Sequence, residues 1–262
     1  MVNSFWFNAI NINCFKNDFR VIKDLNLKLA YSENVILIGP NGSGKSSLIE
    51  VINRNIYPVI AKESKLKIFD NEHINLWELR KRISTVNNDI KKRINPNLQV
   101  SDLILSGLYG KYCYIKNQSE RDSNEVEKIM KSMNISYLAK KYFSYLSDGE
   151  KQISLIARAL IKKPDILILD EPNANLDYKS KFFVIDKINE LSKLNTKIFC
   201  VTHDISMITE IYDRVIMLKD GKIIADGNQS KVLNSENINI LYGIHVEVSK
   251  NNELWNISRL SK

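Results

Sequence analysis

Apolar and polar residues alternate along the first third of the chain in blocks that predict strands and one helix. Short apolar runs within residues 5–30, with strict alternation over 25–29, are typical of antiparallel strands. The run Val-Ile-Leu-Ile at 35–38 has no polar member, which is typical of a parallel strand buried on both faces. Helical spacing follows over 46–53, and residues 64–87 return to strand and turn patterns.

The middle of the chain has a different texture. Residues 88–160 are charged and permissive for helix, which predicts a helical lobe inserted into an α/β core. Helices are predicted inside this lobe at 100–108, 123–133 and 151–160. Beyond it, apolar runs at 166–169 and 197–201 predict strands that frame a helix over 179–191. Residues 214–225 predict a strand hairpin.

Length and composition limit the class of protein. A chain of 262 residues is near the upper limit for one hydrophobic core, so one α/β domain with an attached lobe is favoured over two independent domains. Lys and Arg exceed Asp and Glu by 38 to 30. This surplus of +8 is either a lysine-rich solvated surface or an adaptation to anionic partners, such as nucleotide phosphates, a membrane face or nucleic acid.

Cysteine usage and hydropathy indicate a cytosolic setting. Cys14, Cys113 and Cys200 are far apart and odd in number, so they predict neither a disulfide framework nor a metal site. The N-terminal residues lack a basic segment followed by an apolar stretch, so we expect no signal peptide. No apolar run approaches the roughly 18 residues of a membrane span. If the protein works at a membrane, another chain supplies the membrane part.

The loop after the first buried strand carries the chemistry of phosphate binding. Residues 39–46 satisfy G-x-x-x-x-G-K-S/T, in which glycines let backbone N–H groups turn toward phosphates. Lys45 is suited to β- and γ-phosphate oxygens, and the Ser46 hydroxyl to Mg²⁺. The predicted nucleotide-binding residues are Gly39, Pro40, Asn41, Gly42, Ser43, Gly44, Lys45, Ser46 and Ser47. A glycine-rich surface turn is the competing interpretation, but it explains neither the preceding strand nor the following helix.

A second apolar strand delivers two acids. Residues 166–169 are followed directly by Asp170 and Glu171, at the strand end where α/β sheets bind ligands. We predict that Asp170 holds Mg²⁺, directly or through water, and that Glu171 orients or deprotonates the attacking water. In isolation these would be solvated acids at a strand end. Paired with the phosphate loop, they predict hydrolysis of a nucleoside triphosphate.

Further motifs resemble those of the ATP-binding subunits of ATP-binding cassette (ABC) transporters. Leu146-Ser147-Asp148-Gly149-Glu150 looks like the family signature LSGGQ and stands 23 residues before the Asp170 strand end. The segment 171–177 is similar to the family's catalytic acid and D-loop, and Val201-Thr202-His203-Asp204 to its switch histidine. The resemblance covers roughly residues 10–225. It implies a P-loop NTPase core, RecA-like with a mixed sheet and an antiparallel β subdomain, plus an inserted helical signature subdomain.

The resemblance also implies subdomain boundaries and site residues. The core would comprise 1–87 and 161–225, the helical subdomain 88–160 and a C-terminal extension 226–262, all in one domain over 1–262. The implied second-subunit contacts to ATP are Ser147, Asp148, Gly149, Glu150 and Asp177. His203 would contact the γ-phosphate and act with Glu171 in catalysis. Phe15 is at the spacing of the adenine-stacking aromatic, with Phe19 as fallback, although either is equally interpretable as a core residue.

One family residue is missing. The family's glutamine after the edge strand, which contacts Mg²⁺ and the lytic water, has no counterpart here. An ordinary alignment puts Asn88 in that place, and a sub-group with a longer loop puts Lys91 there. Asn88 has an amide oxygen to offer a metal, whereas a charged Lys91 has no acceptor. Asn88 is therefore predicted as a metal contact, with the turnover rate and the coupling to a permease in question.

The implied protein is a cytoplasmic ATPase, peripheral on the cytoplasmic membrane face, with ATP and Mg²⁺ as cofactors. Its partners would be a second ATP-binding subunit, homo- or heterodimeric, a membrane permease and indirectly a solute-binding protein, with no direct nucleic-acid contact. Residues 100–110, the Asp148-Gly149 form of the signature and the tail at 241–243 and 254–255 resemble importers of iron siderophores and molybdate-like oxyanions. The alternatives are a soluble cassette ATPase acting on nucleic acid, ribosomes or cofactor assembly, and a nucleotide-binding scaffold with impaired turnover.

Overall fold

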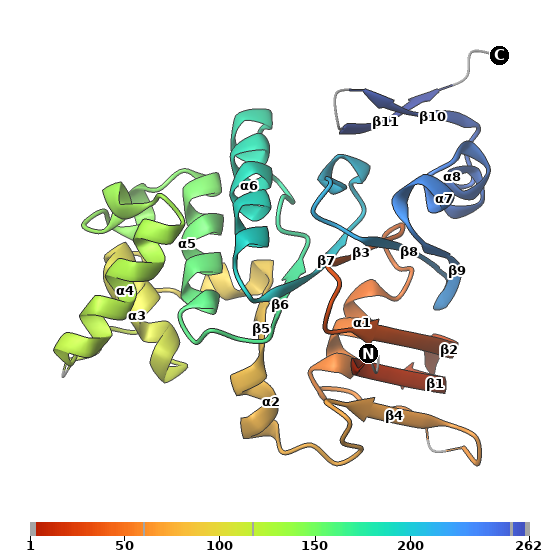
Figure 1. Cartoon of the computed structure of the whole chain (residues 1–262), viewed down its shortest axis with the longest axis horizontal. Coiled ribbons are helices and arrows are strands. Elements are labelled where there is room, and N and C mark those ends of the chain that lie inside the picture. Colours follow the sequence, from red (N-terminus) through yellow and green to blue (C-terminus); the bar gives the residue numbers. More distant parts are fainter. Residues whose placement is uncertain (1–3, 60, 117, 252–253, 260–262) are drawn as a thin grey trace. The chain divides into compact units, whose positions relative to one another are not determined.

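The computed structural model describes residues 4–59, 61–116, 118–251 and 254–259. The chain divides into two compact units, here called the terminal unit (Met1–Arg80 with Lys197–Lys262) and the middle unit (Lys81–Thr196). Figure 1 shows the elements of both. Residues 1–3, which belong to the segment inspected for a signal peptide, lie outside the described residues.

The terminal unit contains a mostly parallel sheet. Its central strand β3 (Val35–Ile38) is buried at every residue, as the uninterrupted apolar run predicts. β3 pairs in parallel with β7 (Lys197–Thr202) and β8 (Arg214–Lys219), and β9 (Lys222–Gly227) pairs antiparallel with β8. The order in this unit is therefore β7-β3-β8-β9, and the predicted hairpin over 214–225 is confirmed. Helix α1 (Lys45–Ile52) follows β3.

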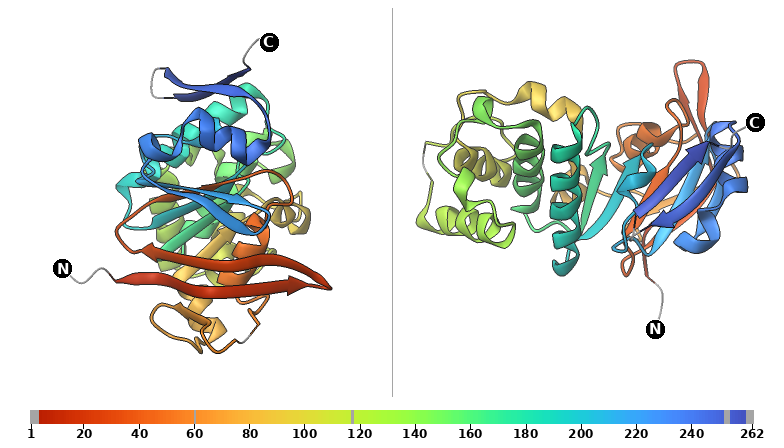
Figure 2. Two further views of the ribbon diagram at one scale, coloured as in Figure 1. Left: turned by 90° about the vertical axis from the view of Figure 1, so that its right-hand side faces the viewer. Right: turned by 90° about the horizontal axis from the view of Figure 1, so that it is seen from above.

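An antiparallel sheet completes the N-terminal part of the terminal unit. β1 (Phe5–Lys16) lies between β2 (Phe19–Ala30) and β4 (Lys65–Ile68). Leu25, Leu27 and Leu29 alternate inward and are buried, which is the period-two pattern of a half-buried strand. Figure 2 shows the long β1–β2 pair within this unit. The antiparallel strands predicted for residues 5–30 are confirmed.

The C-terminal extension of the terminal unit forms elements for which the sequence made no prediction. Two short helices, α7 (Gln229–Val232) and α8 (Ser235–Tyr242), precede the antiparallel pair β10 (Val246–Asn251) and β11 (Leu254–Arg259). β10 contacts α8, and β11 contacts the 3₁₀ turn η5 (Ile205–Met207). The extension therefore packs against the segment that follows β7.

The middle unit has a parallel strand pair and a group of helices. β5 (Ile83–Val86) pairs in parallel with β6 (Ile166–Asp170), and the last residue of β5, Val86, pairs with Leu169, one residue before the end of β6. The short helix α2 (Leu76–Arg82) leads into β5, where only strand and turn structure was predicted. With only Leu79 buried, α2 has too little apolar periodicity to be detected from sequence.

The helices predicted for the lobe are present. α3 (Val100–Tyr109) contacts both α4 (Glu120–Ser132) and α5 (Asp148–Leu160), and α5 contacts α6 (Tyr178–Glu190). Gly107 permits the close crossing of α3 and α5, because a Cβ there would lie 2.3 Å from the carbonyl oxygen of Arg158. The 3₁₀ turns are η1 (Asn88–Arg93), η2 (Ser136–Leu138), η3 (Phe143–Tyr145) and η4 (Leu191–Lys193). Among the described residues, no helix is both long and apolar enough to cross a membrane.

Candidate functional site

The phosphate loop connects β3 to α1 in the terminal unit, and its glycines are required by its geometry. Gly42 and Gly44 have φ angles of 82° and 105°, in the left-handed region that favours glycine. At Gly39 a Cβ would lie 2.2 Å from the carbonyl oxygen of Leu218 and 2.7 Å from Ser43 Oγ. The loop is thus wound tightly against β8, and α1 begins beside it without a side-chain cap. The positive end of the α1 dipole favours an anion at this loop.

Two buried polar side chains make the loop suitable for phosphate. Lys45 is only 6% exposed, and its Nζ donates to the carbonyl oxygens of Gly39 at 2.8 Å and Pro40 at 3.0 Å. Ser43 is 2% exposed, and its Oγ has no hydrogen-bond partner among the described residues. A buried hydroxyl without a partner is costly, so the loop fits a ligand that brings oxygen acceptors. The residues present fit a nucleotide phosphate.

The acidic pair stands where β6 ends in the middle unit. Asp170 is the last residue of β6, and Glu171 follows it with a φ of 50°. A left-handed glutamate is uncommon and marks a sharp turn, which the hydrogen bond from Ala174 N to Glu171 O at 3.1 Å closes. Both residues are partly exposed as a whole, but the Oδ1 atom of Asp170 is buried.

The two candidates for the missing glutamine have different surroundings. Asn88 begins η1 just after β5, and its Nδ2 is 3.5 Å from the carbonyl oxygen of Glu171, long for a hydrogen bond but in contact. Lys91 instead interacts with the signature segment: burial lowers its pKa, Asp148 raises it and Lys151 lowers it. Asn88 therefore lies beside the acidic strand end within the middle unit.

The signature segment forms the N-terminus of α5. Ser147 is the N-cap: its Oγ accepts from Glu150 N at 3.2 Å, while its own N–H donates to Glu150 Oε2 at 2.9 Å. Lys141 Nζ pairs with Glu150 Oε1 at 3.2 Å. Burial raises the pKa of Glu150, but the Ser147 N–H and Lys141 outweigh it and the pKa is lowered. Glu150, which was predicted to contact ATP, thus completes a capping box within its own helix.

Asp177 lies beside this segment. Its Oδ1 accepts from Ser180 N at 2.7 Å and caps α6, and this bond to the charged form lowers the Asp177 pKa. At Gly149 a Cβ would lie 3.1 Å from Ser180 Cβ, so α5 and α6 approach closely there. A pocket of about 480 Å³ opens at the same place. Its lining residues are Tyr137, Ser147, Glu150, Asp177, Lys179, Ser180 and Phe183.

His203 and Phe15 both lie in the terminal unit. His203 directly follows β7 and is exposed, and its carbonyl oxygen accepts from Tyr242 Oη at 2.9 Å. Phe15 is 45% exposed and Phe19 76% exposed near the turn of the β1–β2 hairpin. The interpretation of either aromatic as a core residue is therefore wrong. Their exposure leaves both available to an adenine ring.

Oxygen donors suited to Mg²⁺ are present in both units. The Ser46 hydroxyl is exposed in the first turn of α1, and the Asp170 carboxylate stands at the end of β6. Among the described residues, no group of three or more His, Cys, Asp or Glu could hold a metal by itself. The donor chemistry fits Mg²⁺, which usually binds one or two protein oxygens and completes its shell with water and substrate phosphates.

The predicted residues are divided between the two units. The phosphate loop, His203 and Phe15 belong to the terminal unit, whereas the acidic pair, Asn88, the signature and Asp177 belong to the middle unit. Tyr242 was missed as a contact of His203, although the sequence singled out its segment as a family-like tail. A hydroxyl-to-carbonyl contact across 39 residues has no local sequence pattern.

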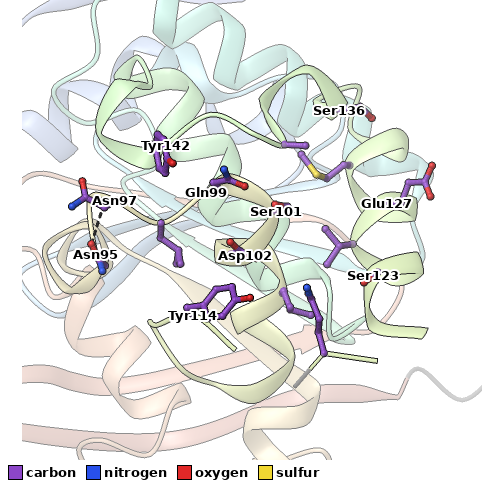
Figure 3. Close-up of a pocket in the computed structure, with 16 residues that line it drawn as sticks. Asn95, Asn97, Gln99, Ser101, Asp102, Tyr114, Ser123, Glu127, Ser136 and Tyr142 are labelled. Carbon is purple, nitrogen blue, oxygen red and sulfur yellow. Dashed lines mark hydrogen bonds between the residues drawn. The ribbon is translucent and has the colours of Figure 1, made fainter. Parts of the chain in front are cut away.

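A more spacious pocket, of about 770 Å³, lies elsewhere in the middle unit. Figure 3 shows Asp102 and Ser101 on its α3 side, Ser123 and Glu127 on its α4 side and Tyr142 at its edge. None of its lining residues is among the predicted nucleotide-binding or catalytic residues. Volume alone therefore does not identify the nucleotide site, whose residues line a tightly wound loop and strand ends.

A glycine loop between a buried parallel strand and a helix, with a buried lysine beside it, defines a P-loop nucleoside triphosphatase fold. The family model described as ABC transporter matches residues 22–174, more than half of the chain. The chain belongs to the ABC transporter family, as an ATP-binding subunit. The resemblance inferred from the motifs and the predicted fold class are both confirmed.

Several known proteins are similar to the chain. It is 32% identical over 93% of its length to an uncharacterised ABC transporter ATP-binding protein of Lactococcus lactis, and covers 94% of that protein. It is 36% identical over 86% to one of Methanocaldococcus jannaschii, again covering 86%. An inward-facing putative metal-chelate type ABC transporter matches with a TM-score of 0.78 at 21% identity, with 99% of both chains covered. A dimeric ATP-binding cassette in a post-hydrolysis state with ADP and phosphate matches with a TM-score of 0.67 at 25% identity, covering 85% and 98%.

Proposed function

We propose that this chain hydrolyses ATP to energise a separate membrane permease. The observation that carries the proposal is the phosphate loop, in which the Ser43 hydroxyl is buried with no hydrogen-bond partner among the described residues and the ammonium of Lys45 is buried beside it. Lys45 would neutralise phosphate charge, and the α1 N-terminus would add its dipole. Glu171 would orient and deprotonate the attacking water, and His203 would bond to the γ-phosphate.

Mg²⁺ is the second cofactor of this proposal. Mg²⁺, when bound, supplies positive charge to the phosphate oxygens as they develop negative charge in the reaction. Ser46 and Asp170 would hold it through their oxygens. Asn88 would occupy the place of the family glutamine, because its amide lies at the Glu171 turn. Phe15, half-exposed on β1, would stack on the adenine ring.

The complete site would need a second subunit. Ser147 and Gly149 lie at the N-terminus of α5, where backbone amides favour an anion, and Asp177 lines the same pocket. We infer that the signature of one subunit closes over the ATP of the other in a head-to-tail dimer, whose second subunit is another copy of this chain or a related chain. The similar cassette solved as a dimer with ADP and phosphate supports this arrangement. The dimer would bind at the cytoplasmic face of the membrane.

The finer proposal concerns cargo. Residues 100–110 and the tail segments at 241–243 and 254–255 resemble importers of metal chelates and oxyanions, and the similar inward-facing transporter is named as metal-chelate type. Other relatives are named for transport of glutamate and arginine, at 31% and 30% identity. We propose a metal chelate or oxyanion, to be tested by uptake of labelled ferric siderophore and molybdate, with glutamate as the comparison, in cells with and without the chain. Loss of glutamate uptake alone would overturn this assignment.

The hydrolytic proposal is tested by Glu171→Gln in the purified full chain. We expect kcat for Mg²⁺-dependent ATP hydrolysis to fall by about 10²–10³-fold, as for loss of a general base, with the Kd for ATP changed by less than about threefold. Glu63→Gln, at an exposed glutamate outside the site, should leave both values unchanged. Activity that survives Glu171→Gln would contradict the assignment of the base.

A further inference from the structure

The tail of the chain makes a direct contact with the residue proposed to sense the γ-phosphate. Tyr242, the last residue of α8, donates its hydroxyl hydrogen to the carbonyl oxygen of His203 at 2.9 Å. The two residues are 39 positions apart in sequence. This contact has no role in the proposed hydrolysis, and it does not involve the phosphate loop.

A second set of contacts ties the same tail to the rest of the segment between β7 and β8. Gln229 Nε2 donates to the carbonyl oxygens of Thr209 and Tyr212, at 2.8 Å in each case. The indole Nε1 of Trp255 donates to Gln229 Oε1 at 3.0 Å and so fixes the orientation of that amide. Lys250 adds an ion pair with Glu210 at 3.4 Å. The extension therefore holds the segment after His203 at both of its ends.

The helix that carries Tyr242 is itself firmly placed. Ile238 and Leu241 are 0% and 1% exposed, so they anchor α8 in the core of the terminal unit. β10 is bonded to α8 through Val246 N and Asn239 Oδ1 at 2.9 Å. Figure 1 shows α8 beside the β10–β11 pair. The backbone that carries the Tyr242 side chain is therefore held in place by packing and by this hydrogen bond.

We propose that Tyr242 is a positioning residue for His203, so that the C-terminal extension controls the switch histidine. The carbonyl that Tyr242 holds belongs to the peptide plane following the His203 Cα, and the orientation of that plane helps to set the direction in which the exposed imidazole leaves the backbone. The inference rests on the proposed role of His203 in hydrolysis. It adds that the preorganisation of this imidazole comes from outside the nucleotide-binding motifs.

The first test observes His203 without turnover. Tyr242→Phe removes only the hydroxyl, and histidine-selective ¹³C NMR resolves few signals because the chain has three histidines. The His203 ring signal, assigned by its loss in His203→Ala, should shift or broaden in Tyr242→Phe. Tyr57→Phe, at a 63% exposed tyrosine of the same unit, should leave it in place. An unshifted, equally sharp His203 signal in Tyr242→Phe would overturn the proposal.

The second test is a double-mutant cycle on Mg²⁺-dependent ATP hydrolysis. Loss of one positioning hydrogen bond predicts a fall in kcat of about three- to tenfold, with KM for ATP within about twofold. In the His203→Ala background, Tyr242→Phe should have no further effect, because the two residues act through one group. Trp255→Phe, which removes the indole donor to Gln229, should lower kcat in the same direction but less. Equal fold losses from Tyr242→Phe in both backgrounds would contradict the proposal.

The two hypotheses fail in different ways. If His203→Ala retains the kcat of the unmodified chain, the proposed role of His203 is wrong. If His203→Ala loses activity while Tyr242→Phe keeps full kcat and an unchanged His203 signal, the catalytic role stands and the positioning role is wrong. A lower thermal midpoint without any change in kcat or in the His203 signal would show that Tyr242 is only structural.

Discussion

Asn88 and Lys91 differ in what a single side chain can offer a cation. A neutral amide presents an oxygen acceptor, and an ammonium presents only donors. Burial lowers the pKa of Lys91, Asp148 raises it and Lys151 lowers it further. The charged groups that act on Lys91 are therefore residues of the signature helix. Asn88 contacts the Glu171 turn at 3.5 Å. A shortened amide in place of glutamine would keep the chemistry and reduce the reach by one methylene.

This difference predicts that substitution of Asn88 lowers the rate of hydrolysis, whereas substitution of Lys91 leaves it nearly unchanged. Asn88→Ala should lower kcat for ATP hydrolysis by about tenfold, the scale for losing one oriented polar contact in a transition state, and should raise the Mg²⁺ concentration that gives half-maximal rate. Lys91→Ala should leave both within about twofold. The measurement is a Mg²⁺ titration of ATPase rate at saturating ATP. A larger effect from Lys91→Ala would mean that the longer-loop alignment is correct.

At the scale of elements, the capping box that stabilises the N-terminus of α5 is made of residues of the signature segment. Ser147 and Glu150 exchange hydrogen bonds with each other's backbone N–H, and Lys141 adds an ion pair. A cap of this kind contributes about 1 kcal/mol to helix stability. The charged glutamate also favours the positive N-terminal end of the helix. The element that would present Ser147 to a nucleotide is therefore held rigid by Glu150.

The lowered pKa of Glu150 predicts how this contribution depends on pH. A carboxyl with a depressed pKa in the folded state stabilises the fold above its unfolded pKa, and the stabilisation is lost as pH falls through the folded value. Glu150→Gln should lower the thermal midpoint by about 1–3 °C at pH 7. The difference should shrink as pH falls below the ordinary glutamate pKa of about 4.3. Calorimetry at several pH values measures the thermal midpoints, with Glu63→Gln as the control. If the midpoint difference between Glu150→Gln and the unmodified chain grew on acidification, the prediction would be contradicted.

Elements were predictable from sequence where one local force dominates. The run Val35–Ile38 and the alternation at Leu25–Leu29 specify burial directly, and the structure agrees. Helix α2 was not predicted, because only Leu79 is buried among its seven residues and the sequence therefore has no apolar helical period. The exposure of Phe15 depends on a register shift between Cys14 and Phe15, which no propensity encodes. The contact of Asn88 with the Glu171 turn follows from the pairing of β5 with β6. These strands are far apart in the sequence, so local patterns do not predict that contact.

At the scale of the whole molecule, we propose that a second subunit completes the site. The phosphate loop and the signature each lie at a helix N-terminus, which favours an anion, so each would serve one nucleotide in a different subunit. Binding of ATP should then pull two copies together. Hydrolysis should let them separate, because it removes the γ-phosphate that both helix ends contact.

The chain should therefore dimerise on ATP when hydrolysis is blocked. Glu171→Gln with ATP and Mg²⁺ should shift in size-exclusion chromatography with light scattering from the mass of one chain to that of two, and ADP should leave it monomeric. Combining it with Ser147→Arg should abolish the dimer, since a bulky side chain at the α5 N-terminus would block the second subunit's approach to the γ-phosphate. Adding Lys45→Ala should abolish it by removing the phosphate contact, whereas Glu63→Gln should have no effect. A dimer that forms equally with Ser147→Arg, or a monomer under all nucleotides, would show that the signature of a second copy does not complete this site.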